Sequence, residues 1–590
     1  MIKEALDSPD KALSKSVEKA IKDGNLVSHA LPFTTHTELL DKDLFEYGLS
    51  IVDRIDAISG HKTVSAKMPD VPPCFVWRHD GAEIVVIYEG EYGDAFTLPE
   101  LDKVLYFDHT ADNKGARTKR AVLNKLARLR IEFPDCLVRA GSMNDIADEL
   151  WNIRGRLPVL EGEIGDTWIH GVGTDPYKVG GLRTLCRLRD NWLADGRMNR
   201  DSQEYRQFSD ALLCIAEHTW GMDMKTHLAD TRNYTKKKFV SARMRDRVRT
   251  GLPFGDFPFR FLAWKANTFG RKKYSYSIIE KSWAEQREYL NRAVAALSED
   301  KQTEAITALG ALRPKTLPAF DKSTAYGYKS RITAGGYSLQ INCKGGITLY
   351  NDGVEVFNGR ELPLFTYRSY GADDYNYFEE HYMRSRVPWA VHDYLRPSLR
   401  KDNKYLQGEF DYIATGAWIE DDGSKAVVNM DLACDSGLCD SLGAPRKVRM
   451  TYTLDENGLN LRVIWIGKDA TRTTESIALH LYPNFDKVYY QKIGSTVDPM
   501  TTVSGGNRKL SVVEGINIFL GGNEYLLLNK EAVLVASDGG NILHYDNAQP
   551  DFDKHGITYV LHNNVWGTNF PLWYEDNAIF NFVIKKNTDK

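Results

Sequence analysis

The first 165 residues alternate short apolar runs with stretches in which apolar side chains recur at helical spacing. Spacing at i, i+3 and i+4 predicts amphipathic helices over residues 41–58, 113–133 and 142–154. The runs between them predict strands at 26–34, 63–67, 83–88, 103–107, 136–139 and 157–161. Strands that alternate with helices of this length favour βα units and a parallel sheet, so we expect residues 1–177 to form a β/α barrel-like domain.

The pattern changes twice further along the chain. Long Arg- and Ala-rich periodic segments predict a helical bundle over residues 178–312, with helices at 178–195, 202–219, 235–249 and 276–297. Over residues 313–590, short β-branched and aromatic runs are separated by Gly, Asn and Asp, as in 337–342, 346–351, 447–454, 459–466 and 532–537. This pattern predicts an antiparallel β-sandwich region, so the expected fold class is multidomain α/β plus all-β.

Polar residues follow the predicted N-terminal strands. In a parallel barrel the active site lies at the carboxyl ends of the strands, so these positions decide the chemistry. In chain order they include His36, Glu38, Asp70, His109, Asp112, Glu163, Asp166, Trp168 and His170.

This combination of side chains suits sugar hydrolysis. One carboxylate can act as nucleophile, a carboxylic acid can donate the proton, and an aromatic ring can face the pyranose. Asp and His together also suit a divalent cation held against sugar hydroxyls. The alternative is that these loops are polar because they are solvated, and that His36 or His109 only caps a strand.

Two further stretches carry candidate contacts to a carbohydrate. His218 closes a predicted helix in Glu217-His218-Thr219-Trp220-Gly221 and either contacts substrate or serves as a favourable partner of the helix dipole. Residues 563–574 are rich in Asn and Trp, and they either face a ligand or pack as a domain-docking loop.

Charge and cysteine content narrow the classes of function. The net charge of −4 gives no field that would recruit nucleic acid, and the basic run 236–249 is expected to be a solvated helix face. The seven cysteines show no C-x-x-C spacing, so a thiolate zinc site is not expected, while Cys434 and Cys439 are close enough in sequence to invite a bridge. The sequence leaves the oligomeric state open.

Several other classes lack their signatures. No apolar run reaches the roughly 18 residues of a membrane span, so no membrane partner is expected. The compartment stays open, and the cytoplasm follows only if Met1 is the true N-terminus. The sequence contains no G-x-x-x-x-G-K-[ST], H-E-x-x-H or G-x-S-x-G motif, so nucleotide hydrolysis, zincin proteolysis and α/β-hydrolase chemistry are not indicated.

Three long stretches carry a family resemblance: His29–Glu38, Gly162–Pro176 and Asn564–Phe570. They resemble an uncharacterised family, domain of unknown function 5054, which is itself similar to the glycoside hydrolase family 38 α-mannosidases. The resemblance spans nearly the whole chain. It implies a seven-stranded β/α barrel, a three-helix middle domain and C-terminal β-sandwiches. It also implies retaining hydrolysis with an Asp nucleophile, an Asp acid/base and a zinc or similar divalent ion held by Asp and His.

The resemblance assigns roles to three residues. Asp112, in His109-Thr110-Ala111-Asp112-Asn113-Lys114-Gly115, resembles the general acid/base, and His170 resembles the late metal ligand. Asp70 occupies the context of the nucleophile without the Gly-His-Thr that follows it in relatives. The chain also begins after the relatives' His-x-Asp metal motif, and Met68 runs into Pro69 as though a βα unit were excised. We therefore expect an incomplete barrel, shortened at its N-terminus and with an internal deletion near residues 68–70.

Two hypotheses follow from these features. The first is an α-mannosidase-like glycoside hydrolase that uses Asp70, Asp112 and a metal at His170, aided by Asp166 or His36. The second is a catalytically degenerate carbohydrate-binding paralogue, or an incomplete gene product, that keeps the scaffold without the activity.

Overall fold

The computed structural model describes residues 37–50, 57–60, 69–88, 95–106, 116–141, 143–165, 169–228, 230–246, 248, 275–359, 361–384, 386–401 and 404–588. These residues form two compact units. Unit 1 contains the described residues of 52–164 together with 501–506, and unit 2 contains those of 29–51, 165–500 and 507–590.

The main sheet of unit 1 has four strands in the order β1 (Ala57–Gly60), β3 (Ala82–Tyr88), β2 (Cys74–His79) and β6 (Val159–Leu160). β1 runs parallel to β3 and β2 runs parallel to β6, but β2 and β3 form an antiparallel hairpin. Asp80 and Gly81 make its two-residue turn, both with positive φ, 47° and 80°. An Asp-Gly pair favours this kind of turn. The prediction of an all-parallel sheet was therefore wrong.

The strand ends of unit 1 consequently do not converge as expected. β3 and β6 run in opposite directions, so their carboxyl ends lie at opposite edges of the sheet. β5 (Val104–Tyr106) pairs with β4 (Ala95–Thr97) in a separate two-stranded sheet. Residues 136–139 are irregular rather than a strand, and the predicted strands 26–34 and 63–67 lie outside the described residues.

A small apolar core holds unit 1 together. Val76 and Val85 of the hairpin are buried with Leu150 of α6 (Met143–Ile153). Helix α5 (Lys119–Glu132) begins after Thr118, whose side chain accepts a hydrogen bond from Ala121 N–H. Both helices lie within segments predicted to be helical.

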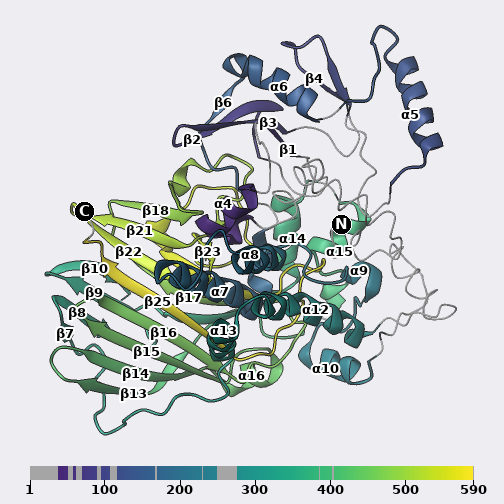
Figure 1. Ribbon diagram of the computed structural model, residues 1–590. Helices are drawn as coiled ribbons and strands as arrows, with labels where there is room; N and C mark the ends of the chain where they lie inside the picture. Colours follow the sequence, from purple (N-terminus) through teal and green to yellow (C-terminus); the bar gives the residue numbers. More distant parts are fainter. Residues whose placement is uncertain are drawn as a thin grey trace. The chain divides into compact units, whose positions relative to one another are not determined.

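Unit 2 opens with a set of helices, five of which overlap segments that the sequence predicted to be helical, while those at 224–227 and 299–311 were not predicted. The set consists of α4 (Lys42–Ser50), α7 (Pro176–Ala194), α8 (Gln203–Ile215), α9 (Met224–His227), α10 (Lys236–Met244), α12 (Tyr276–Ala295) and α13 (Glu299–Ala311). Helices α7, α8, α12 and α13 contact one another (Figure 1). Helix α7 starts at Pro176, and the Asp175 side chain caps it by accepting from Lys178 N–H. Its buried Trp192 contacts Phe208 of α8.

Unit 2 also contains three antiparallel sheets (Figure 1). The nine-stranded sheet has the order β13 (Ile413–Asp421), β14 (Ala426–Ala433), β15 (Lys447–Asp455), β16 (Gly458–Ile466), β25 (Ala578–Lys586), β22 (Asn523–Asn529), β21 (Gly515–Leu520), β18 (Lys487–Lys492) and β19 (Ser495–Val497). The six-stranded sheet has the order β12 (Gly408–Asp411), β11 (Phe365–Ser369), β17 (Glu475–Leu481), β24 (Ile557–Asn563), β23 (Leu534–Ala536) and β20 (Leu510–Val512). The third sheet has the order β10 (Val354–Asn358), β9 (Ile347–Asn351), β8 (Tyr337–Ile341) and β7 (Ile332–Ala334).

One apolar core joins these sheets. It contains Leu339 of β8, Tyr452 of β15 and Leu479 of β17, each fully buried. Alternate residues of β8 and β15 point into it, as period-two strands require. The prediction of a large antiparallel β region is confirmed. Helices α14 (Ala372–Tyr382) and α15 (Pro388–Tyr394) lie between β11 and β12 in the chain.

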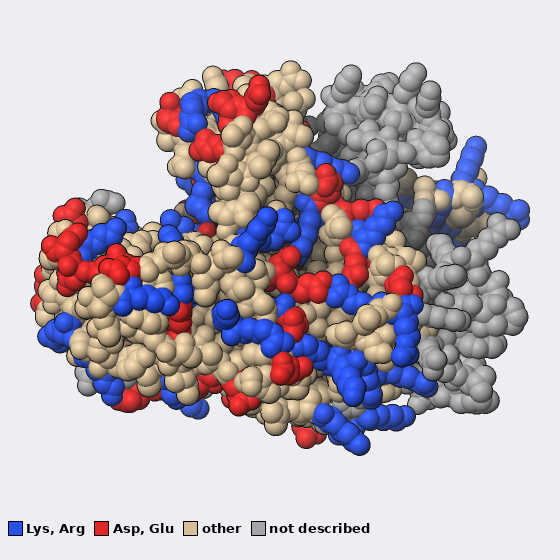
Figure 2. All heavy atoms as spheres, turned by 90° about the horizontal axis from the view of Figure 1, so that it is seen from below, with Lys and Arg blue, Asp and Glu red and all other residues tan. Residues whose placement is uncertain are grey.

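Charged side chains of both signs are interspersed on the face shown in Figure 2. This agrees with the near balance of 76 basic and 80 acidic residues. Among the helices that the structure describes, none combines the length and apolar character needed to cross a bilayer.

Candidate functional site

Five of the predicted site residues lie outside the described part of the chain. They are His36, His109, Asp112, Asp166 and Trp168. The structure places the other five, which are Glu38, Asp70, Glu163, His170 and His218.

Asp70 and Glu163 both border the segment 501–506, which belongs to unit 1. The N–H of Asp70 donates to the Ser504 carbonyl at 2.6 Å, and the Glu163 carbonyl accepts from the N–H of Val503 at 2.8 Å. The Asp70 side chain is exposed. A segment more than 300 residues away in sequence thus holds the backbone of both predicted residues, and no local pattern indicated this.

Glu38 and His218 make ionic contacts within unit 2. The Glu38 carboxylate lies 3.5 Å from Lys492 Nζ and accepts from the N–H of Val512 at 3.3 Å. His218 Nδ1 lies 2.9 Å from the carboxylate of its neighbour Glu217. Glu38 and His218 therefore each already have a partner within the protein.

His170 lies in the 3-10 helix η3 (Ile169–Thr174) and is only 2% exposed. Its ring stacks on Trp566 with centroids 4.9 Å apart, and the edges of Phe378 and Tyr382 complete the surroundings. Nε2 lies 3.3 Å from the Ile542 carbonyl. The described neighbours of this imidazole are thus aromatic rings and a carbonyl.

Two of the stretches that carry the family resemblance meet here. The His170 carbonyl accepts from Asn563 Nδ2 at 3.0 Å. Gly171 lies so close to Phe570 that a Cβ there would meet the ring at 2.2 Å, so the packing requires glycine. Phe570 also contacts Trp220 with centroids 5.6 Å apart. Residues 169–176, 217–221 and 563–574 therefore form one packed cluster, which we call the motif cluster.

A buried lysine sits at the edge of the motif cluster. Lys178 is 1% exposed, and its Nζ lies 4.2 Å above the Trp220 ring. Burial lowers the pKa of Lys178 to about 7, against the opposing effect of Asp175 and Glu217. Asp175 itself is paired with Arg287, whose Nε lies 2.7 Å from Asp175 Oδ2. The sequence analysis did not single out Lys178.

A metal site was predicted around His170. Asp and His are suitable ligands for a divalent ion. Within the described ranges, however, no group of three or more His, Cys, Asp or Glu side chains is placed to hold one, and the His170 ring stacks on Trp566. The proposed partners His36, Asp112 and Asp166 are outside those ranges, so the metal stays a prediction.

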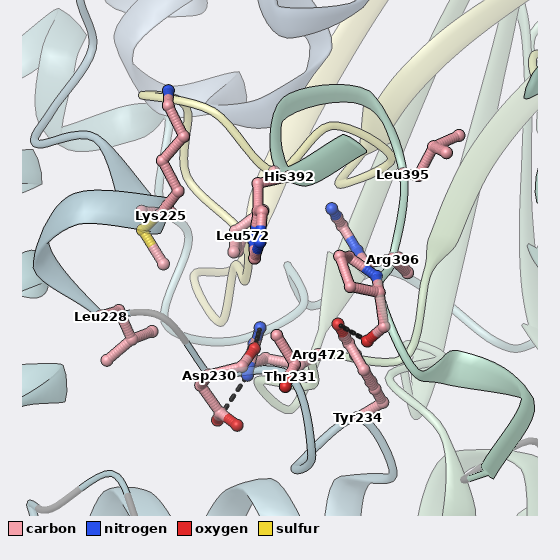
Figure 3. Close-up of a pocket in the computed structure, with 13 residues that line it drawn as sticks. Lys225, Leu228, Asp230, Thr231, Tyr234, His392, Leu395, Arg396, Arg472 and Leu572 are labelled. Atoms are coloured by element: carbon pink, nitrogen blue, oxygen red, sulfur yellow. Dashed lines mark hydrogen bonds and ion pairs between the residues drawn. The ribbon is translucent and has the colours of Figure 1, made fainter. Parts of the chain in front are cut away.

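A polar pocket lies beside the motif cluster (Figure 3). Its wall is formed by helices α9 and α15, by the loop that follows α9, and by two further loops, one with Arg472 and one with Gly567. It is lined by Met224, Lys225, Leu228, Asp230, Thr231, Tyr234, His392, Leu395, Arg396, Pro397, Arg472, Gly567 and Leu572. Its cavity volume is about 20 Å³. One water molecule needs roughly 10–15 Å³ and a typical small-molecule site has about 300–1,000 Å³, so the pocket in this form is of water size.

An ion pair closes one side of the pocket (Figure 3). Arg472 Nη1 lies 2.5 Å from Asp230 Oδ2, and both side chains are buried. Tyr276 donates its hydroxyl to the same carboxylate. Burial alone would raise the pKa of Asp230, but Arg472 and Tyr276 hold it below its usual value.

The other side of the pocket is built on α15. Arg396, 7% exposed, donates to the carbonyls of Asn564 and, at 3.1 Å, Trp566. Asp393 Oδ1 lies 2.8 Å from Lys225 Nζ, and burial raises the pKa of Asp393 to about 6. The sequence analysis missed these residues because isolated charges in helical segments give no spacing signal.

The family comparison now has its structural context. Residues 172–461 match the model of a family described as domain of unknown function (DUF5054). The predicted family is confirmed over this stretch. It includes the helices α7 to α13 and every charged residue of the pocket except Arg472. No curated protein sequence matches the chain.

The chain was also matched to solved structures, at low sequence identity. An alpha-mannosidase from Enterococcus faecalis V583 is 9% identical, with a TM-score of 0.47. The match covers 99% of this chain and 83% of the mannosidase chain. A protein of glycosyl hydrolase family 38 from Enterococcus faecalis is 10% identical with a TM-score of 0.44, covering 98% and 79%. A galactose mutarotase-like protein from Clostridium acetobutylicum is 12% identical with a TM-score of 0.24, covering 44% and 94%.

Proposed function

We propose that this chain is a glycoside hydrolase-like protein that acts on carbohydrate by α-mannosidase-like, retaining hydrolysis. The observation that supports the proposal is the motif cluster. Two of the three stretches that resemble the mannosidase-like family lie about 400 residues apart in sequence and pack against each other through His170 and Trp566. The two stretches therefore belong to one structural core of this chain and are not isolated strings of residues.

In the proposed reaction, the Asp70 carboxylate attacks the anomeric carbon while Asp112 donates a proton to the departing oxygen. Asp112 then takes a proton from water, which releases the sugar from Asp70. A retaining pair has carboxyl groups about 5–5.5 Å apart. A divalent ion would bind sugar hydroxyls, and no step of this reaction is assigned to it.

A second candidate function is carbohydrate binding without hydrolysis. Two observations favour it: the Asp70 side chain is exposed, and the β2–β3 hairpin prevents the described strands of unit 1 from forming a parallel barrel. In this case the scaffold would hold a sugar and leave the glycosidic bond intact.

One experiment separates the two functions. The full chain is assayed for metal content, for hydrolysis of aryl α- and β-glycosides, and for binding of the same compounds by calorimetry. Asp70→Asn and Asp112→Asn are compared with Asp102→Asn, a change at an exposed position. Turnover lost in the first two variants and kept in the third supports hydrolysis. Binding without turnover supports the second function, and absence of both overturns the proposal.

A further inference from the structure

Two thiols face each other in the segment that joins β14 to β15. The Sγ atoms of Cys434 and Cys439 lie 3.4 Å apart, one before and one within the short helix α16 (Ser436–Ser441). Both are free cysteines. Cys439 is 4% exposed, whereas Cys434 is half-buried, so solvent reaches Cys434 more readily than Cys439.

The surroundings fix the position of the buried thiol. The Cys439 Sγ lies 3.7 Å from the Pro445 carbonyl oxygen, and the Tyr412 hydroxyl donates to that carbonyl at 2.7 Å. Lys236 of α10 donates to the Cys439 carbonyl at 2.5 Å. The backbone of Cys439 is thus tied to a neighbouring helix, and its sulfur stays directed at Cys434.

The two thiols differ in acidity. A hydrogen bond with Cys439 lowers the pKa of Cys434 to about 7. The same contact, together with burial, raises the pKa of Cys439. Because a thiolate is the reactive form of cysteine, the nucleophile at neutral pH is Cys434.

We propose that Cys434 and Cys439 form a peroxide-reactive dithiol that closes to a disulfide. The Cys434 thiolate attacks one oxygen of hydrogen peroxide, the O–O bond breaks, and Cys434 becomes a sulfenic acid while hydroxide leaves and takes up a proton. The Cys439 sulfur then attacks the Cys434 sulfur, loses its proton and expels water. With hydrogen peroxide the two thiols lose two electrons, the peroxide gains them, and two waters form.

The geometry permits this closure. A disulfide has an S–S distance of about 2.0 Å, so sulfurs 3.4 Å apart must approach by about 1.4 Å. Rotation of the Cys434 and Cys439 side chains can supply such a movement. The bond would tie the end of β14 to α16, where Lys236 docks α10. This inference goes beyond the proposed carbohydrate chemistry and does not depend on it.

The test uses the full chain and hydrogen peroxide. Samples are quenched with an alkylating agent and digested without reductant, and each cysteine is followed by mass spectrometry. The peptide with Cys434 and Cys439 should lose two hydrogen atoms. The lowered pKa of Cys434 gives it more thiolate at neutral pH and only partly reduces its nucleophilicity, so Cys434 should react about threefold faster than the exposed Cys343.

Two variants identify the roles of the thiols. In Cys439→Ser the sulfenic acid should persist at Cys434 and be trapped by dimedone. In Cys434→Ser the remaining Cys439 should react no faster than Cys343. The proposal is overturned if wild-type Cys434 reacts more slowly than Cys343, if Cys434 pairs with another cysteine, or if Cys439 reacts equally fast without Cys434. The wild-type result stands without the variants, so a folding defect in either leaves the test decisive.

Discussion

Breaking the ion pair at the pocket should strongly destabilise unit 2. Asp230 and Arg472 are 1% and 5% exposed at the side chain, and their charged atoms lie 2.5 Å apart. Replacing Asp230 by Ala leaves the guanidinium buried without its carboxylate. Breaking a buried pair in this way costs about 3–5 kcal/mol of unfolding free energy.

The measurement is unfolding in guanidinium chloride followed by tryptophan fluorescence. This reports on unit 2, because the fully buried tryptophans belong to it: Trp192, Trp220, Trp465 and Trp566. Asp440→Ala is the matched control, since Asp440 pairs with Arg446 at 2.9 Å while 70% exposed. An exposed pair contributes about 0–1 kcal/mol.

The double variant Asp230→Leu/Arg472→Met refines the test. Replacing both charges with apolar groups of similar size removes the unpaired guanidinium, so most of the lost stability should return. The pH dependence has a definite sign. The pKa of Asp230 is lowered in the folded state, so its contribution is present above its unfolded pKa of 3.8 and declines as pH falls below that value. A loss in Asp230→Ala no greater than in Asp440→Ala would refute this reasoning.

Three further predictions address other buried groups. Gly171→Ala should lower unfolding free energy by about 1–3 kcal/mol, because the new Cβ would meet the Phe570 ring; an unchanged denaturation midpoint would contradict the packing described. Burial lowers the pKa of His480 to about 4, so the unfolding free energy should decrease as pH falls from 6.5 to 4. Denaturant titrations at several pH values should show a smaller decrease over this range for His480→Gln. Lys178→Met should raise the denaturation midpoint near pH 6 because it removes a buried charge, and should raise it less near pH 10, where the wild-type lysine is already neutral. An equal rise of the midpoint at both pH values would mean that charge burial is not the cause.

The sequence predicted several helices and strands of unit 2 because their periodicity is strong. Helix α12 and strand β16 have apolar faces that match their buried faces, and the structure gives them nearly the predicted limits. Local periodicity carries this information without reference to the rest of the chain.

The sheet of unit 1 was not predicted because strand direction is not encoded in periodicity. The turn signal was present, however. Asp80-Gly81 stands between Cys74–His79 and Ala82–Tyr88, which is a favoured arrangement for a two-residue hairpin. Reading that pair as a turn would have placed β2 beside β3 and ruled out an all-parallel sheet.

The site was predicted in part. The sequence singled out the stretches that form the motif cluster, but not that His170 would stack on Trp566, since that contact joins residues about 400 positions apart. Nor did it find Arg472 or Arg396, whose importance depends on burial, a property of the folded chain.

We propose that the chain hydrolyses glycosidic bonds through Asp112. The most direct test is the release of aryl alcohol from an aryl α-mannoside by the purified full chain and by Asp112→Asn. The account predicts turnover in the wild type and its loss in the variant, with sugar binding retained. Turnover that survives in Asp112→Asn, or a folded wild type that neither binds nor cleaves any glycoside of the panel, would contradict it.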